Sequence, residues 1–558
     1  MHMFIKLNVG NTETAVVCQQ FQFKVWIYYK RQFHHKFTML RISANWLVSF
    51  YFKRLDNLLS LFVSTTEELQ HPLHRLLFCF LLFPVRLVFV IAFAPFGFIS
   101  GLLWILVLNN KKTFTFSRLI RDSDKINYFN GFSEDLFSIA TINTCLHSDF
   151  ICRLNNQTKS EFRAKRIGDI LSGMNRFPDN DSHDVSVNLG EDIPLGIDQK
   201  VLHLKDSMDF IQINSDYCSQ NGHLNDMSAK LSSANIMLNS LGSHDMYDVI
   251  NHDILCQFPV LDFILLQEVF DYTASKALVK SLHRRYPYII YDPRHDGLFN
   301  NFWFLSSGLL IASKFPITHV NFDVFKHKDG YARVSSLGIL QAKIHLGRSP
   351  TGSNLVGYLA NTHLQPYQGD SPVHWAQLLQ IRAACTTMRT LTSKQDDVVL
   401  FDIVGGDFNL DNMSPADQME RTHPIFEEYV DVCRAAPGRD KCWTVGSEMR
   451  HRPLHDQLVQ SPEGLRYALL TPELRTWYIL DADILKATSD LPRLMPPVDK
   501  MGEVYVTDKS GKRRVDYLLH NRDYPLTVSS FNAVTELAGL TDHVCFSMTF
   551  SPSVQLRK

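Results

Sequence analysis

The sequence carries no strong excess of either charge. It has 56 Lys and Arg residues against 57 Asp and Glu, which gives a formal net charge of -1 over 558 residues. Proteins that bind the phosphate backbone of nucleic acids usually carry a clear basic excess. The balance therefore argues against a nuclease without excluding one, and we expect no nucleic-acid partner.

Other common signals are also missing. The ten cysteines form no C-x-x-C pair and follow no regular spacing, which fits neither a zinc site nor a disulfide scaffold, so we expect reduced thiols facing the cytosol. The first forty residues lack the order of a cleaved signal peptide. No internal repeat is present, and residues 1–42 receive no functional assignment.

One long apolar run is present, from Leu76 to Leu108. It exceeds the roughly 20 residues that cross a bilayer once, yet it is too short for two full spans. Pro84, Pro95, Gly97 and Gly101 interrupt it. Positive charge lies on both flanks, which suits a re-entrant hairpin that returns to the side it entered. A single long, tilted helix is the alternative.

The segment before this run, residues 43–63, is apolar but carries Lys53, Arg54 and Asp56 at its centre. Charges are costly in the middle of a spanning helix, so we expect an interfacial amphipathic helix. Residues 43–110 are thus predicted to be membrane-associated, in a Golgi, plasma, endoplasmic-reticulum or mitochondrial membrane. The flanking basic residues either anchor the segment or bind anionic phospholipid as an activator. They include Arg41, Lys53, Arg54, Arg75, Lys111 and Lys112.

A layered catalytic domain is predicted from residue 111 onward. Residues 137–145 alternate like a strand, and residues 155–171 have the pattern of an amphipathic helix. The polar stretch 172–244 is predicted to be an insertion, partly disordered. Across residues 245–558, apolar strands alternate with helical patterns, which indicates an α/β domain with a central sheet. The clearest strands are 262–266, 357–361, 400–404 and 544–550.

Six short motifs each place a polar residue at the end of an apolar strand, where a sheet-based enzyme presents its reactive groups from a rigid frame. Taken singly, each has an ordinary structural explanation, such as a strand-end acid, a buried histidine or an Asx turn. Together they favour a catalytic site. They are the strand end with Asn143, LLQEVF with Glu268, NTHL with His363, GGDFNLDN with Asp407 and Asn409, RRVDYLLH with Asp516, and LTDH with Asp542 and His543.

In this order the motifs resemble the endonuclease/exonuclease/phosphatase superfamily, over roughly residues 137–550. Within it, DFILLQEVFD, SSGLLIASKFPI, GDFNLDN, RRVDYLLH and LAGLTDH are similar to the versions found in the membrane-inserted neutral sphingomyelinases. The resemblance implies an α/β fold, a four-layered αββα sandwich with an N-terminal membrane-associated helical region. Ser306 departs from the family, where Asn is common, so no substrate contact is assigned to it.

The resemblance also implies an activity, the Mg²⁺-dependent hydrolysis of sphingomyelin in a bilayer to ceramide and phosphocholine. A nuclease on the same fold is one alternative, but it would be expected to have a basic face and no apolar N-terminal region. An inositol-lipid 5-phosphatase is another, but that group carries a PAWCDRIL-type signature where this chain has RRVDYLL. A catalytically inactive membrane scaffold is the alternative from a different class.

The chemistry of phosphodiester cleavage suggests a role for each residue. The reaction requires a hard cation, a deprotonated water and a stabilised leaving oxygen. Glu268 is expected to bind Mg²⁺ directly, and Mn²⁺ could substitute. Asn143 and Asp542 would help to hold the metal or its water. His543 is the candidate general base, and Asp516 would fix its tautomer.

The other three candidate residues are expected to act on the phosphate of the substrate. Asp407 and Asn409 lie two apart on an extended segment, so they point to the same side and can bind the attacked phosphate or the water. By the resemblance, His363 would stabilise the transition state or protonate the ceramide oxygen. The sequence predicts no particular oligomeric state.

Overall fold

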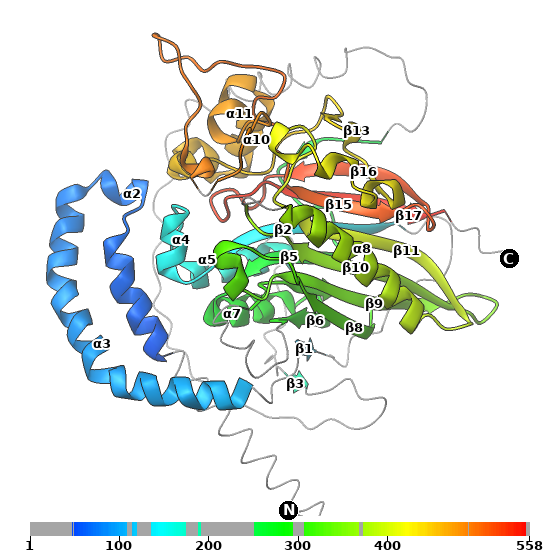
Figure 1. Ribbon diagram of the computed structural model, residues 1–558, viewed down its shortest axis with the longest axis horizontal. Coiled ribbons are helices and arrows are strands. Elements are labelled where there is room, and N and C mark those ends of the chain that lie inside the picture. Colours follow the sequence, from blue (N-terminus) through cyan, green and yellow to red (C-terminus); the bar gives the residue numbers. More distant parts are fainter. Residues whose placement is uncertain are drawn as a thin grey trace, which may run out of the picture. The chain divides into compact units, whose positions relative to one another are not determined.

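Two β-sheets packed face to face carry the motif-bearing part of the chain (Figure 1). The structure is a computed structural model, and it describes residues 47, 50–108, 114–119, 136–173, 188–190, 250–293, 306–367, 372–488 and 490–553. Residues 1–42 and most of the predicted insertion 172–244 lie outside the described residues.

The first sheet has nine strands within the described residues, and its central strands β2 and β5 run parallel. In spatial order the strands are β3 (Asn188–Gly190), β1 (Thr115–Arg118), β6 (Tyr288–Tyr291), β7 (Leu310–Ser313), β5 (Phe263–Val269), β2 (Phe137–Leu146), β17 (Cys545–Pro552), β16 (Leu526–Val534) and β4 (Ile254–Leu255).

The second sheet has six strands within the described residues, and its central strands β10 and β11 are also parallel. In spatial order they are β12 (Tyr429–Asp431), β15 (Asp516–Asn521), β11 (Asp397–Asp407), β10 (Asn354–His363), β9 (Gly338–Arg348) and β8 (Ile317–Val324). Each of the apolar runs predicted at residues 137–145, 262–266, 357–361, 400–404 and 544–550 overlaps one of these strands, so those strand predictions are confirmed.

Phenylalanines from both sheets meet in the core between them. Phe401 of β11 lies 5.6 Å from Phe137, 5.5 Å from Phe263 and 5.4 Å from Phe550, measured between ring centroids. All four are buried. Gly357 on the neighbouring strand leaves room for this packing, because a Cβ there would lie 2.3 Å from the Phe401 ring. Aromatic pairs at these separations stabilise the contact between the sheets beyond the area that they bury.

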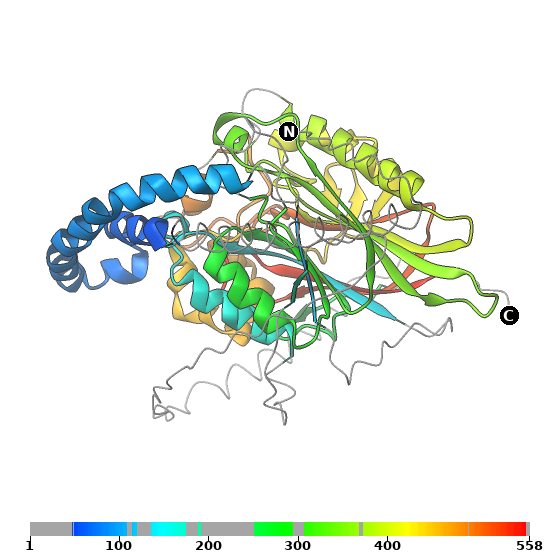
Figure 2. The ribbon, with the colours of Figure 1, turned by 90° about the horizontal axis from the view of Figure 1, so that it is seen from below.

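Helices cover the outer face of each sheet. Helices α5 (Ser160–Leu171) and α7 (Tyr272–Leu282) pack on the first sheet, and α8 (Val373–Thr392) packs on the second. Figure 2 shows α8 on one side of the strands and α5 with α7 on the other. The expected four-layered αββα sandwich is therefore confirmed.

The helix predicted over residues 155–171 begins later, at Ser160, as α5, and a separate short helix, α4 (Asp149–Leu154), ends before the predicted range. Asn156 and Lys159 between them have φ angles of 58° and 54°. A left-handed backbone ends an α-helix, and periodicity alone does not reveal it. Asn156 is held there by its side chain, since its amide donates to the His451 carbonyl at 2.6 Å.

The chain divides into two compact units, and the smaller one contains most of the long apolar run. In this unit residues 51–59 are helical and run antiparallel to part of α3 (Pro72–Leu108). Phe50 lies edge-on to Phe93 at 5.4 Å, and Arg54 lies over Phe89 at 5.9 Å. These contacts join the basic turn of the first helix to the apolar helix.

The sequence predicted a re-entrant hairpin within the apolar run, but the structure has one continuous helix there, with Pro84 and Pro95 inside it. A helix can accommodate proline with a bend, so neither proline has to end it. Among the described residues, this one helix is long and apolar enough to cross a membrane, over Arg75–Ile99 with a mean hydropathy of 2.7. The membrane-associated region 43–110 stays a prediction.

The short segment Ser60–Phe78 belongs to the larger unit together with the sheets. It contains helix α2 (Thr66–Leu69), which begins with a capping box formed by Thr65 and Glu68. Glu68 also accepts two hydrogen bonds from Nη1 of Arg153, at 2.9 and 2.8 Å. The chain that enters α3 is thus fixed to helix α4 of the catalytic domain.

Candidate active site

The polar motifs meet because their strands end at one edge of the sandwich. Asn143 and Glu268 lie near the carboxyl ends of the parallel strands β2 and β5, and His363 and Asp407 end the parallel strands β10 and β11. Parallel strands bring their carboxyl ends to the same edge of a sheet, and the two sheets stack. Four residues that are far apart in the sequence are therefore brought together.

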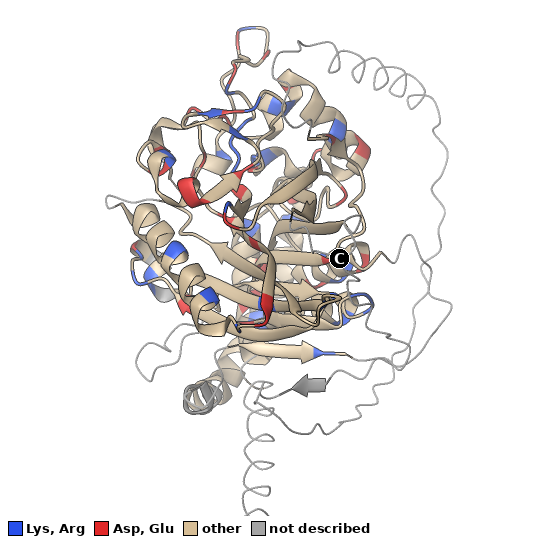
Figure 3. Cartoon of the chain, turned by 90° about the vertical axis from the view of Figure 1, so that its right-hand side faces the viewer, with Lys and Arg blue, Asp and Glu red and all other residues tan. Residues whose placement is uncertain are grey.

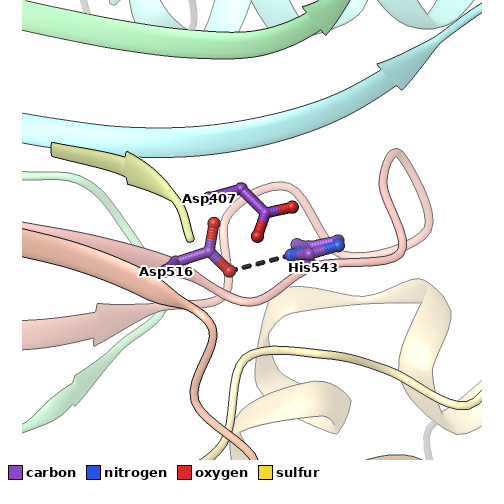
Figure 4. A group of neighbouring side chains, drawn as sticks. All are labelled: Asp407, Asp516 and His543. Atoms are coloured by element: carbon purple, nitrogen blue, oxygen red, sulfur yellow. Dashed lines mark hydrogen bonds and ion pairs between the residues drawn. The ribbon is translucent and has the colours of Figure 1, made fainter. Parts of the chain in front are cut away.

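His543 and Asp516 form the central pair of this site (Figure 4). Nδ1 of His543 lies 2.8 Å from Oδ2 of Asp516. A carboxylate can only accept here, so Nδ1 carries the proton of this bond, and Nε2 has a free lone pair when the ring is neutral. Asp516 is 1% exposed, and its other oxygen, Oδ1, has no hydrogen-bond partner among the described residues.

Asp407 lies beside this pair. It is paired with Asp516 across the β11–β15 ladder, and ligand atoms of Asp407, Asp516 and His543 all lie within 4.8 Å of one another. The two glycines before Asp407, Gly405 and Gly406, leave room for neighbouring strands to lie close to β11. A Cβ at Gly406 would lie 1.9 Å from the Thr362 carbonyl oxygen, and its φ of 143° also favours glycine.

Both carboxylate oxygens of Asp407 accept hydrogen bonds. The Asn143 amide donates to Oδ2 at 2.9 Å, and the backbone N–H of Asn409 donates to Oδ1 at 2.8 Å. Asn409 has a φ of 51° and its amide nitrogen donates to the Leu364 carbonyl at 3.1 Å. Asp407 and Asn409 thus form an Asx-type turn, and their expected role at the phosphate stays a prediction.

His363 lies between two acids. Its Nε2 is 3.6 Å from Oδ2 of Asp407 and 3.8 Å from Oε1 of Glu268. The side chain is buried, and neither ring nitrogen has a hydrogen-bond partner among the described residues. A buried imidazole without a partner is unusual in a structural role. The ring is available for a group that enters the site.

Glu268 has a left-handed backbone, with a φ of 59°. Its Oε2 lies 3.1 Å from Nε2 of His147, a residue that the sequence reasoning did not single out. Burial raises the pKa of Glu268, but His147 and then His363 outweigh it and lower the pKa to about 2. The carboxylate is therefore ionised at neutral pH.

Asp542 has its own histidine partner. Its Oδ2 lies 3.3 Å from Nε2 of His451, a second residue that the sequence reasoning missed. Burial raises the pKa of Asp542, but the hydrogen bond from His451 and the charge of His543 outweigh burial. The pKa of Asp542 therefore lies below its usual value. Thr541 joins this loop to β2, because its hydroxyl donates to the Asn143 carbonyl at 2.6 Å.

Charge at the site also acts on the central pair. Burial lowers the pKa of His543, but the charge and hydrogen bond of Asp516, together with Asp407 and Asp542, raise it well above its usual value. Burial raises the pKa of Asp516 against the opposing effect of His543. A cluster of acidic side chains of this kind favours a cation that binds among them.

The structure thus brings Asn143, Glu268, His363, Asp407 and Asn409 into one chain of contacts, with the Asp516–His543 pair beside Asp407. Asp542 is adjacent to His543 in the chain, although its described contact is to His451. His147 directly follows the leucine that ends the Asn143 strand, which was a usable signal. His451 lies in a segment without a motif, so nothing in the sequence pointed to it.

The donor set fits a hard divalent cation. The site offers carboxylate and amide oxygens at a buried edge, and Oδ1 atoms of Asp516 and Asp542 have no hydrogen-bond partner among the described residues. Oxygen donors of this kind are the ligands that Mg²⁺ and Mn²⁺ prefer. Ser306 lies outside this set, since its hydroxyl accepts from the Gly308 N–H at 3.1 Å and shapes a turn.

The stacked sheets with helices on both outer faces have the architecture of the endonuclease/exonuclease/phosphatase fold. No family model matches the chain. Sphingomyelin phosphodiesterase 5 of Danio rerio is 30% identical over 537 residues, which are 90% of this chain and 94% of the relative. The chain therefore belongs to the sphingomyelin phosphodiesterase family, and the expected enzyme class, phosphoric diester hydrolase, is confirmed.

Other relatives match over a shorter length. Sphingomyelin phosphodiesterase 3 of Homo sapiens is 34% identical over 316 residues, which are 54% of this chain and 46% of the relative, so the chain spans about half of that protein. The crystal structure of SmcL aligns with a TM-score of 0.35 and 14% identity, over 75% of this chain and 99% of that one. The family assignment rests on the zebrafish relative and not on this superposition.

Proposed function

We propose that this chain hydrolyses sphingomyelin in a membrane to ceramide and phosphocholine, with the help of Mg²⁺. The observation that carries the proposal is the buried group of Asp407, Asp516 and His543, whose ligand atoms lie within 4.8 Å of one another. A base oriented by one acid, with a second acid beside it, is what activation of a water against a phosphodiester requires. Membership of the sphingomyelin phosphodiesterase family supports the choice of lipid.

His543 removes the proton from the attacking water in this proposal. The hydrogen bond from Nδ1 to Asp516, 2.8 Å long, leaves Nε2 as the nitrogen that accepts. Asp516 keeps the ring in this tautomer and stabilises the imidazolium that forms, as the acid does in a catalytic triad. The Ser447 hydroxyl accepts from the Asp516 backbone N–H at 3.2 Å, which keeps the pair in register.

Glu268 is the residue that would bind Mg²⁺ directly, and Mn²⁺ could take its place. Asn143 and Asp542 would hold the metal or its water. When bound, the cation neutralises charge on the phosphate and lowers the pKa of a coordinated water. Glu268 suits this role because its carboxylate is ionised and each of its oxygens faces an imidazole nitrogen.

Asp407, Asn409 and His363 act on the phosphate. The Asn409 backbone bond to Asp407 and the amide bond from Asn143 fix the Asp407 carboxylate on both oxygens. His363 has unpartnered ring nitrogens between Asp407 and Glu268, so it can donate to a phosphate oxygen or to the leaving ceramide oxygen. These roles follow from position and remain proposals.

The apolar helix α3 would attach the enzyme to the bilayer that contains its substrate. The segment Arg75–Ile99 is long enough to cross once, and its most apolar 18-residue window has no buried residue in the described structure. Anionic phospholipid could act on the neighbouring basic residues. Arg75 is a poor candidate for this, because its guanidinium donates to the carbonyls of Ser60, Leu61 and Val63. Arg41, Lys111 and Lys112 lie outside the described residues.

A nuclease on the same fold is the second function to test. In the cartoon of Figure 3, Lys and Arg residues are interspersed with Asp and Glu residues along the described chain. Purified full-length protein should be assayed on labelled sphingomyelin, phosphatidylcholine and an abasic-site duplex, with and without Mg²⁺. The expected result is Mg²⁺-dependent release of phosphocholine from sphingomyelin, lost in His543→Ala. Cleavage of the duplex alone would overturn the proposal.

A further inference from the structure

His147 has no role in the mechanism described so far, yet its ring is held firmly at the site. It directly follows β2, and its carbonyl accepts from the Ser160 hydroxyl at 2.6 Å. The ring stacks on Phe270, with centroids 4.4 Å apart and planes at 29°. Backbone and ring are thus both fixed, so the direction of Nε2 is determined.

That nitrogen points at the proposed metal ligand. Nε2 of His147 lies 3.1 Å from Oε2 of Glu268, and Nδ1 of His147 is buried with no hydrogen-bond partner among the described residues. Two lone pairs facing each other at this distance would repel, so a proton lies between them and Nε2–H is the donor. Within the described part of the chain, the one hydrogen bond that the ring makes is to Glu268.

Glu268 needs such a partner. Its backbone is fixed in an uncommon left-handed conformation, but the last torsion of a glutamate side chain is broad and roughly two-fold. Without a partner, the two carboxylate oxygens would exchange places and tilt. A donor on Oε2 leaves Oε1 facing the interior of the site, where His363 lies 3.8 Å away.

We propose that His147 is a positioning residue for Glu268: it holds Oε2, so that Oε1 is presented to the divalent cation. The inference rests on the proposed metal role of Glu268. Partners of metal ligands orient them, and their loss typically weakens metal affinity by about 10- to 100-fold. His147 would therefore act on cation affinity more than on the chemical step.

The test compares variants of the full-length protein in detergent, with Mg²⁺ affinity measured by titration calorimetry. His147→Leu removes the donor and should weaken Mg²⁺ binding about 10-fold or more. His147→Gln retains an amide donor at similar reach and should recover most of the affinity. At saturating Mg²⁺, kcat should be close to that of the wild type in both.

A matched control uses another stacked histidine. His252 stacks on Trp443, with centroids 4.8 Å apart and planes at 15°, and its described hydrogen bond is to the Ile250 carbonyl instead of a carboxylate. His252→Leu should leave Mg²⁺ affinity unchanged. In a Glu268→Gln background, His147→Leu should cause no further loss, because the histidine acts through the glutamate.

Three results would overturn the proposal. The first is wild-type Mg²⁺ affinity in a folded His147→Leu protein. The second is Mg²⁺ affinity in His147→Gln that is as weak as in His147→Leu. The third is a nitrogen coupling in the pulsed EPR spectrum of the Mn²⁺-loaded wild type that His147→Gln abolishes. The last would make His147 a ligand. If His147→Leu unfolds, His147→Asn replaces it, since its amide is too short to reach Glu268. Calorimetry needs no substrate, so failure of the proposed lipid activity would be seen separately.

Discussion

Asp516 faces two partners at once: its Oδ2 lies 2.8 Å from Nδ1 of His543, and its backbone pairs with that of Asp407 on the neighbouring strand. The proposed base, His543, is therefore oriented by the first residue of β15. The acid beside it, Asp407, is the last residue of the neighbouring strand β11. Neither can move without disturbing the ladder that carries both.

This arrangement predicts non-additive losses of activity. His543→Ala should lower kcat by on the order of 10³-fold or more, with little change in KM. Asp516→Asn should also be severe, because an amide can favour the wrong tautomer. The double variant should be little worse than His543→Ala alone, since the acid acts through the histidine. Steady-state kinetics on sphingomyelin micelles measure this, and losses that multiply would assign the base elsewhere.

Substitution of Glu268 should separate metal binding from folding. Glu268→Gln should abolish activity and weaken Mg²⁺ binding, because it removes the charge of the proposed direct ligand. The thermal unfolding of the metal-free protein should remain cooperative, which circular dichroism can check. A folded Glu268→Gln protein with near-normal turnover would contradict the role given to this residue.

Helix α2 should contribute measurably to stability. Glu68→Ala removes the carboxylate that accepts two hydrogen bonds from Arg153, whose side chain is 11% exposed, and should destabilise the protein by about 1–3 kcal/mol. Glu67→Ala on the same helix is the matched control. Its side chain is 68% exposed, so the change should stay within about 0.5 kcal/mol. Equal changes in denaturant midpoint for the two variants would show that α2 does not depend on this contact.

A buried histidine outside the site should make the protein sensitive to acid. Burial lowers the pKa of His374 to about 4, from an ordinary value of 6.5, and its Nε2 lies 2.6 Å from the Gln365 carbonyl oxygen. Between these values the unfolded chain binds a proton that the folded chain does not, so stability is full above pH 6.5 and falls as pH decreases toward 4.

The measurement is the free energy of unfolding between pH 7 and pH 4, in wild type and in His374→Gln. The variant should show a shallower fall, because glutamine does not titrate and can still donate to the carbonyl. Identical slopes would mean that other groups cause the loss in acid. His423 and His520, whose pKa values burial also lowers to about 4, are then the next residues to replace.

Much of this architecture could be predicted from the sequence, because strands that are buried on both faces consist of runs of apolar residues. Strand β2 is buried at all ten positions, and its run was found together with Asn143 at its end. The order of the motifs resembles that of the endonuclease/exonuclease/phosphatase superfamily, and this resemblance predicted the αββα sandwich. Asn143, Glu268, His363 and Asp407 lie at or near the carboxyl ends of such runs, whereas Asp516 begins β15 and His543 precedes β17.

The missed features depend on contacts that no local pattern records. His147 and His451 matter because each meets a carboxylate from a distant segment, Glu268 and Asp542 respectively. The break between α4 and α5 depends on left-handed residues such as Asn156, whose side chain bonds a carbonyl 295 positions away. Pro84 and Pro95 suggested a turn, but a helix tolerates them.

At position 268 the residue that activity requires lowers the stability of the fold, because Glu268 has a left-handed backbone. A non-glycine residue held there costs about 1–3 kcal/mol. Glycine would relieve this cost and would leave an inactive enzyme. In a library selected for thermostability alone, without substrate, position 268 should be among the first to lose its original residue. Its persistence in such a library would show that Glu268 stabilises the fold, which would contradict this expectation.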